Sequence, residues 1–239
     1  AHAKAILIGE HFVLDGVAAI ALGLPAFTTE THWVHSARPL ALDAQSAAKL
    51  PPLAMTDTIA MVSAAAQAAG IAATGEVSIV SSVPMGRGLG SSAALAVAML
   101  RAATSIATAD NHRRGAGGPD IGGPIWLLAA ARAVESVVHG RSSGLDPAAA
   151  MSGGGAIVFA GGEVRETLTP LATSSLRAAR WVIADAGPAP ATGVAIARAN
   201  AARLRMGDVA TAALGVDVAA AAYAARAGLM AGDPGQIAE

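Results

Sequence analysis

The sequence contains no cysteine, and aromatic and charged residues are scarce. Among 239 residues, 3% are aromatic and 14% are charged, and the formal net charge is −1. The absence of cysteine excludes disulfides, thiol nucleophiles and thiolate metal ligands, and it suits a reducing cytoplasm. A near-neutral chain with scattered Lys and Arg creates no field that would attract nucleic acid or an anionic membrane surface. We therefore expect neither as a partner.

Long hydrophobic runs and a leader-like start are also missing. The apolar stretches 17–27 and 93–100 are too short to span a bilayer, and no basic segment precedes an apolar one at the N-terminus. These features predict a cytoplasmic protein. A length of 239 residues with 54% hydrophobic content is enough for one large or two modest domains.

The periodicity of the apolar residues predicts a mixture of strands and helices. Alternation and β-branched content predict strands at 5–8, 18–22, 29–36, 76–82, 153–160, 162–168 and 181–185. A period of 3.6 predicts helices at 56–69, 91–107, 124–138, a short one from 147, and two Ala-rich helices that close the chain. Gly70 and Gly140 occupy positions typical of helix C-terminal caps, and 111–123 predicts a loop. We expect a domain change near 170–180.

A glycine-rich loop that runs directly into a helix is the most informative motif. Residues 84–94 read PMGRGLGSSAA. Glycines let the main chain approach a polyphosphate closely, and a helix start offers unpaired N–H groups and the positive end of the helix dipole. Neither G-x-x-x-x-G-K-[ST] nor the strand-linked G-x-G-x-x-G fits this stretch. Taken alone, the loop is equally an ordinary turn followed by a helix cap.

Three segments in order resemble the GHMP kinases. GLGSSAALAVAML resembles the nucleotide loop of that superfamily, KAILIGEHFVLDG at 4–16 resembles its opening strand and substrate turn, and ESVVHGRSSGLDPAAA at 135–150 resembles its mevalonate kinase branch. A weaker match, PATGVAIA, places Thr192 at a threonine that opens a helix in that branch. The resemblance implies an α+β fold: a ribosomal-protein-S5-like N-terminal domain at 1–175, then an incomplete ferredoxin-like C-terminal domain at 176–239.

The third motif of the superfamily, a C-terminal glycine-rich loop, has no counterpart in the sequence. Two interpretations follow: a truncated enzyme, or a shortened nucleotide-binding module without catalytic activity. We favour truncation, because 216–230 has the pattern of a helix whose apolar face needs a partner.

The resemblance implies phosphoryl transfer from ATP, with Mg²⁺, to an alcohol. Asp146 would be the base, and Lys4 would pair with it and stabilise charge on the reacting oxygens. Asp146 before Pro147 is otherwise typical of a helix cap, and Lys4 of an exposed strand residue. Glu135 and Ser92 would hold Mg²⁺, which takes one or two oxygen ligands from protein. A solvated helix position is the alternative for Glu135.

The implied nucleotide-binding residues are Pro84, Gly86, Gly88, Leu89, Gly90, Ser91, Ser92 and Ala93. The implied substrate-binding residues are Glu10, His11, Ser143, Gly144 and Thr192. His139 follows Glu135 by one helical turn, and its expected role is charge complementation at a helix end, without catalytic duty.

The acceptor is expected to be mevalonate, with ATP as the phosphoryl donor. Phe12 and Val13 make the substrate turn hydrophobic where galactokinases carry GEHTDY, which argues against a sugar. To bind phosphomevalonate, the site would have to neutralise the phosphate of the substrate, and the sequence offers no surplus of cations for this beyond Arg87 and Arg141. Arg141 itself stands where small polar residues are common in the family. The resemblance thus implies a mevalonate kinase-like phosphotransferase of isoprenoid precursor synthesis. It is also compatible with assembly as a homodimer. The sequence leaves phosphomevalonate or a related acceptor open.

Overall fold

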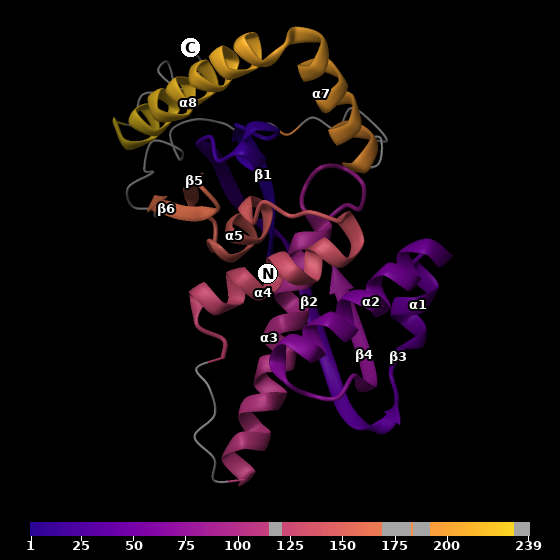
Figure 1. The fold of residues 1–239 in the computed structure, drawn as a ribbon. Coiled ribbons are helices and arrows are strands. Elements are labelled where there is room, and N and C mark those ends of the chain that lie inside the picture. Colours follow the sequence, from indigo (N-terminus) through magenta and orange to yellow (C-terminus); the bar gives the residue numbers. More distant parts are fainter. Residues whose placement is uncertain (115–120, 169–182, 184–191, 232–239) are drawn as a thin grey trace.

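The protein has an α+β architecture built around one long strand (Figure 1). The computed structural model describes residues 1–114, 121–168, 183 and 192–231. The strands are β1 (His2–Ile8), β2 (Ala19–Pro39), β3 (Ala41–Leu42), β4 (Thr74–Ser81), β5 (Ala156–Ala160) and β6 (Glu163–Leu168). The helices are η1 (Phe12–Asp15), α1 (Ala44–Lys49), α2 (Pro52–Ala69), α3 (Ser91–Arg114), α4 (Pro124–His139), α5 (Leu145–Met151), α7 (Thr192–Met206) and α8 (Asp208–Ala231).

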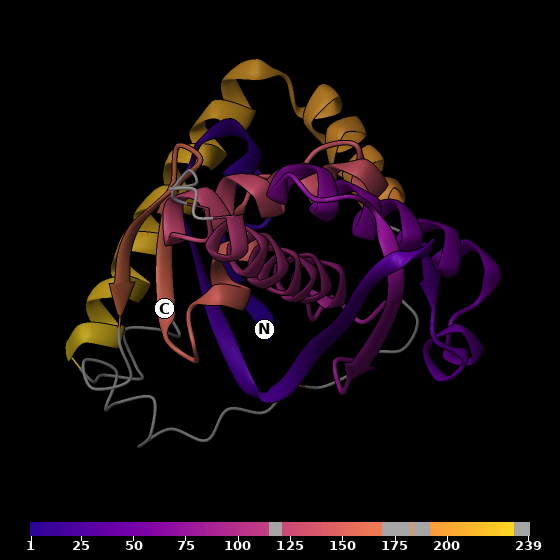
Figure 2. The same cartoon turned by 90° about the horizontal axis from the view of Figure 1, so that it is seen from below.

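The 21-residue strand β2 joins the two parts of a six-stranded sheet. The strand order is β3-β4-β2-β5-β6, with β1 also paired to β2; among the described strands, β3 and β4 pair in parallel and the other pairs are antiparallel. The first half of β2 pairs with β1 and β5, and the second half pairs with β4. Figure 2 shows that β2 bends sharply between these halves. The bend lets helices cover both parts of the sheet.

The prediction of two separate strands at 18–22 and 29–36 is wrong, because β2 runs through both. The glycine and proline between them do not form a turn. A Cβ on Gly23 would lie 2.5 Å from the Ser152 hydroxyl oxygen, so glycine is needed there for close packing. Pro25 is exposed, and its fixed φ is compatible with extended chain.

Two main apolar clusters hold helices against the two parts of the sheet. Helices α2, α3 and α4 share a core with β4, which includes Met61, Val62, Val77, Val97, Met99, Leu100, Leu127 and Val134. Helix α8 shares another with β2, β5 and β6, which includes Ile20, Leu22, Val158, Leu168, Ala222, Ala225 and Leu229. Figure 1 shows α7 and α8 as an arch over the end of the molecule that carries β1, β5 and β6.

The predicted helices are present, with longer ends than expected. Helix α2 begins at Pro52, where proline suits the first turn, and it ends at Ala69, followed by its cap Gly70 in the left-handed conformation. Helix α3 continues to Arg114, so the first four residues of the predicted loop at 111–123 are helical. Helix α1, η1 and β3 were not predicted, because each is too short to show a period.

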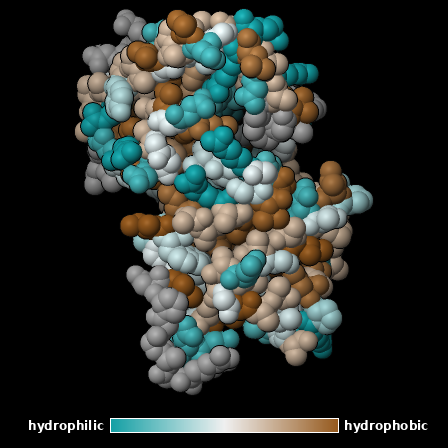
Figure 3. Space-filling view, in the orientation of Figure 1, coloured by the Kyte–Doolittle hydropathy of each residue, from teal (hydrophilic) through white to brown (hydrophobic). Residues whose placement is uncertain are grey.

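Two helical stretches among the described residues, Ser91–His112 and Asp208–Ala231, are long and apolar enough to cross a membrane by length and composition alone. A core helix meets the same criterion, and α3 is such a helix, with 0% exposure at Val97, Met99 and Leu100. Helix α8 is mostly exposed, and Figure 3 shows apolar side chains interspersed with polar ones on the face drawn. The expectation that no membrane is involved stays a prediction.

The α+β fold class is confirmed. The strand predicted at 181–185 and the domain change near 170–180 fall outside the described residues, except for Ile183. The domain limits 1–175 and 176–239 therefore stay a prediction.

Candidate active site

The glycine loop forms an open cradle at the start of α3. Gly86, Gly88 and Gly90 have φ values of 68°, 72° and 72°, which disfavour residues with a side chain. The first helical hydrogen bond of α3 runs from the Ala94 amide to the Gly90 carbonyl at 2.9 Å. The amides of the three preceding residues therefore have no partner within the helix, and they stand at its positive end. This is the arrangement that binds phosphate groups.

Lys4 lies directly against this loop. Its amide donates to the Leu89 carbonyl at 3.0 Å, and a Cβ on Gly90 would lie 2.5 Å from the Lys4 Cγ. Glycine at position 90 therefore serves two purposes, a positive φ and room for the Lys4 side chain. The Lys4 side chain is only 5% exposed, so the alternative of an exposed strand residue is wrong.

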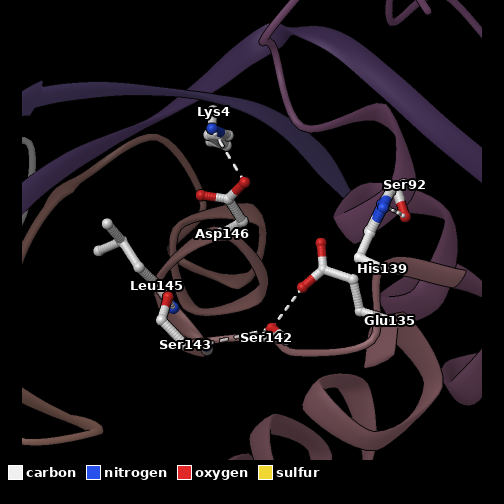
Figure 4. A network of polar contacts seen from close by, with 9 residues as sticks. Lys4, Ser92, Glu135, His139, Ser142, Ser143, Leu145 and Asp146 are labelled. Carbon is white, nitrogen blue, oxygen red and sulfur yellow. Dashed lines mark hydrogen bonds and ion pairs between the residues drawn. The ribbon is translucent and has the colours of Figure 1, made fainter. Parts of the chain in front are cut away.

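The buried ammonium of Lys4 forms an ion pair with Asp146 (Figure 4). Nζ lies 2.9 Å from Oδ2, and the Asp146 side chain is 32% exposed. Helix α5 is capped by Gly144, and Asp146 lies inside the first turn. The helix-cap interpretation of Asp146 is therefore wrong: its side chain points to Lys4, and the carboxylate remains accessible to an incoming ligand.

Glu135 provides a second carboxyl group beside Asp146. It lies on α4 and is only 6% exposed, so the alternative of a solvated helix residue is wrong. The Ser142 hydroxyl donates to Oε2 at 2.5 Å. Burial, followed by the negative charge of Asp146, raises the pKa of Glu135 from 4.5 to about 7. The site therefore holds a carboxyl group that an added cation would stabilise in its charged form.

Ser92 is linked to the helix that carries Glu135 by a contact with His139. The Nε2 of His139 lies 3.1 Å from the Ser92 hydroxyl oxygen, and His139 is four residues after Glu135 on one face of α4. Figure 4 shows Glu135 between Asp146 on one side and the His139–Ser92 pair on the other. The sequence prediction gave His139 no role in the site. The spacing of Glu135 and His139 was the signal that could have found it.

Two oxygen donors of this cluster fit a magnesium ion. The described residues contain no group of three or more His, Cys, Asp or Glu that would form an all-protein metal site. Mg²⁺ does not need one, because it keeps water and substrate phosphates as most of its ligands. The Glu135 carboxyl and the Ser92 hydroxyl are hard donors of the right kind, beside a loop suited to phosphates.

A cavity of about 440 Å³ lies next to the glycine loop. Ser91, Ser92 and His139 border it on the side of the cluster just described. Its other walls come from α1, α2 and β4, and include Leu50, Met61, Ile79 and Val83 together with Lys49 and Asp57. A mostly apolar cavity with a few polar groups beside a glycine-rich helix start is of the kind that suits a nucleotide base.

Two of the predicted substrate residues, Ser143 and Gly144, lie in the turn directly before α5, which carries Asp146. Ser143 accepts a hydrogen bond from the Leu145 amide at 3.2 Å, which shapes the turn before α5. Gly144 has φ 92°, and a Cβ there would lie 2.6 Å from Cδ of Arg132. The packing of Arg132, which the sequence prediction missed, therefore fixes the turn that carries Asp146.

For the other residues that the sequence predicts for the site, the structure gives their position and exposure. Glu10 is exposed and His11 is half-buried, both just before η1. Thr192 opens α7, but its side chain lies outside the described residues. In the loop, Pro84 is exposed and Ala93 is fully buried. Ala93 can therefore offer a ligand only its backbone.

Comparisons with known proteins give one family. Residues 56–154 match the GHMP kinases N terminal domain. A comparison with curated proteins found no matching sequence.

Solved structures of similar fold include the L. major mevalonate kinase in complex with R-mevalonate. It is 19% identical, with a TM-score of 0.66, over 99% of this chain and 70% of that one. A D-glycero-D-manno-heptose 1-phosphate kinase from B. thetaiotaomicron is 16% identical, with a TM-score of 0.57, over 100% and 74%. A mevalonate kinase from Staphylococcus aureus is 28% identical, with a TM-score of 0.45, over 70% of this chain and 53% of its own.

The matched domain includes the glycine loop, Glu135 and Asp146. The long strand with its covering helices gives the same fold as the L. major enzyme. Residues 56–154 are therefore similar to the N-terminal domain of the GHMP kinases, and the fold of the chain resembles that of mevalonate kinase.

Proposed function

We propose that the protein transfers the γ-phosphoryl group of ATP to the primary hydroxyl of mevalonate. The observation that carries the proposal is the Lys4–Asp146 ion pair, 2.9 Å long, set against the glycine loop at the start of α3. A base and a cation beside a phosphate-binding cradle are the parts that phosphoryl transfer requires. The fold shared with an enzyme that holds R-mevalonate supports mevalonate as the acceptor.

In the proposed reaction, Asp146 accepts the proton of the acceptor hydroxyl as its oxygen attacks the γ-phosphorus. The bond between that phosphorus and the β–γ bridging oxygen breaks, and ADP leaves. Lys4 lies 2.9 Å from the Asp146 carboxylate, so it orients this base and offsets negative charge on the reacting oxygens. The free amides at the start of α3 hold the phosphates of the donor.

Glu135 and Ser92 would hold the Mg²⁺ of the proposed kinase. The ion, when bound, neutralises charge on the nucleotide phosphates. The protein contributes the placement of these two ligands. Ser142 fixes one oxygen of Glu135 by its hydrogen bond at 2.5 Å, and His139 fixes the Ser92 hydroxyl at 3.1 Å. Such partners of a metal ligand set its orientation.

The cavity of about 440 Å³ beside the loop is the proposed site of the nucleotide base. A base placed there would put the phosphates of the same nucleotide over the glycine loop, because Ser91 and Ser92 belong both to the cavity and to the helix start. The acceptor would then approach from the side of Asp146, where Ser143 lies.

An ADP-release assay with ATP and Mg²⁺ tests this function. We expect release with mevalonate and none with galactose, homoserine or phosphomevalonate; the Asp146→Asn variant is the control for background hydrolysis. Equal activity on phosphomevalonate would refute the acceptor assignment. ATP binding without ADP release for any acceptor would favour a nucleotide-binding module without catalytic activity.

A further inference from the structure

We propose that Arg203 is a positioning residue that holds the acceptor-binding turn at 10–15 in place. Its contacts join α7 to a turn at the opposite end of the sequence. The inference rests on the proposed function, for which the family resemblance implies Glu10 and His11 as contacts of the acceptor. Arg203 lies on the described part of α7 and was not among the residues that the sequence predicted for the site.

One guanidinium group makes three different contacts with this turn. Its Nη2 donates to the His11 carbonyl at 3.0 Å, and Nη1 lies 2.7 Å from Oδ2 of Asp15. Its central carbon lies 4.5 Å from the centre of the Phe12 ring. The Arg203 side chain is 21% exposed, so these contacts are partly shielded from water. A planar cation with several donors can satisfy all three at once, whereas a lysine ammonium cannot.

The turn faces a cavity on one side. A cavity of about 570 Å³ is lined by Phe12, Asp15 and Val17 and by Gly215 and Tyr223 of α8, and beside it Phe12 and Val17 approach α8 closely at Gly215. Dispersion contacts are lost wherever a wall faces a cavity. The polar contacts of Arg203 therefore add to the apolar packing of Phe12 and Val17 in fixing the position of the turn.

A second arginine, in the loop between α4 and α5, contacts the turn from another side. Arg141 donates to the Leu14 carbonyl at 2.9 Å, and the next residue, Ser142, holds Glu135. The turn thus lies between a contact from the loop that leads to Asp146 and a contact from α7. Arg203 sets where the turn sits relative to Asp146, and hence how the acceptor hydroxyl is aligned. Small misplacements of this kind reduce productive binding.

The test compares Arg203→Lys with Arg205→Lys, an exposed arginine on the same helix. We expect Arg203→Lys to raise the KM for mevalonate about tenfold, the equivalent of one hydrogen bond from a charged donor. The KM for ATP should stay within about twofold, because the nucleotide side of the site is not touched. Arg205→Lys should change neither constant. Asp15→Asn, which removes only the ion pair, should give a smaller rise in the same constant.

Hydrogen exchange provides a readout that does not depend on the acceptor. The Val13, Gly16 and Val17 amides donate within the turn, and we expect them to exchange faster in Arg203→Lys while the loop at 84–92 is unchanged. Unchanged exchange in the turn would overturn the inference, as would equal rises in both KM values. If the wild type uses another acceptor or none, the proposed function fails, and the exchange comparison still decides the role of Arg203.

Discussion

Glu135 makes the stability of the metal-free protein depend on pH in a defined direction. Its pKa in the folded protein is about 7 against an ordinary value of 4.5, chiefly because the carboxyl is buried and secondly because Asp146 is close. A raised carboxyl pKa means that the folded state holds the proton more tightly than the unfolded state does. This residue therefore costs no stability below pH 4.5, costs more as the pH rises from 4.5 to 7, and costs a constant amount above that.

The size of this cost follows from the gap between the two pKa values. One pKa unit corresponds to about 1.4 kcal/mol, so the full cost above pH 7 is about 3 kcal/mol. Glu135→Gln removes the titration but keeps an oxygen that can accept the Ser142 hydrogen bond. The free energy of unfolding of the variant relative to the wild type should therefore increase by about 3 kcal/mol between pH 4.5 and pH 7.5.

Thermal unfolding in EDTA, measured for both proteins from pH 4.5 to 8, tests this reasoning. For a chain of this size, about 3 kcal/mol corresponds to a relative shift of the midpoint of roughly 6–12 °C. Glu76→Gln, at an exposed position on β4, is the matched control and should show no such trend. A difference between wild type and Glu135→Gln that is equal at pH 5 and pH 8 would refute the raised pKa of Glu135.

Three further predictions concern the same cluster. Asp146→Asn should lower kcat by about 10²–10⁴-fold in the ADP-release assay, since it removes both the base and the ion pair with Lys4; near-normal turnover would contradict the proposed role. Glu135→Gln should raise the Mg²⁺ concentration for half-maximal activity at fixed ATP, and an unchanged midpoint would remove Glu135 from the metal site. In chemical denaturation, Gly90→Ala should lower the free energy of unfolding more than Gly86→Ala does. Both changes add a side chain at positive φ, which costs about 1 kcal/mol, but only the one at Gly90 also meets the Lys4 side chain, at 2.5 Å. Equal losses in the two variants would contradict this packing argument.

Most of the local structure could be predicted from the sequence. The glycine loop followed by Ser91, the helices α2, α3 and α4, and the hairpin of β5 and β6 follow from spacing, turn residues and period. These signals are short in range, and neighbouring residues alone produce them. The break predicted inside β2 was wrong, because the glycine at position 23 makes room for Ser152 instead of forming a turn. A contact between residues so far apart in sequence leaves no local pattern.

The parts of the site that matter for chemistry depend on contacts between distant segments. Residue type alone left Asp146 equally suited to a helix cap, Lys4 to an exposed strand and Glu135 to a solvated helix. The fold instead buries Lys4 against Gly90, pairs it with Asp146 and encloses Glu135 beside both.

The sequence by itself therefore determined the element types and the glycine loop at the start of α3, because glycine φ preferences and helix periodicity act locally. Tertiary structure alone decided which of these groups meet. It placed His139 against Ser92 and brought Arg203 to the turn at 10–15. Burial and pairing arise only when chain segments far apart in sequence pack together, and they set both the raised pKa of Glu135 and the position of the turn.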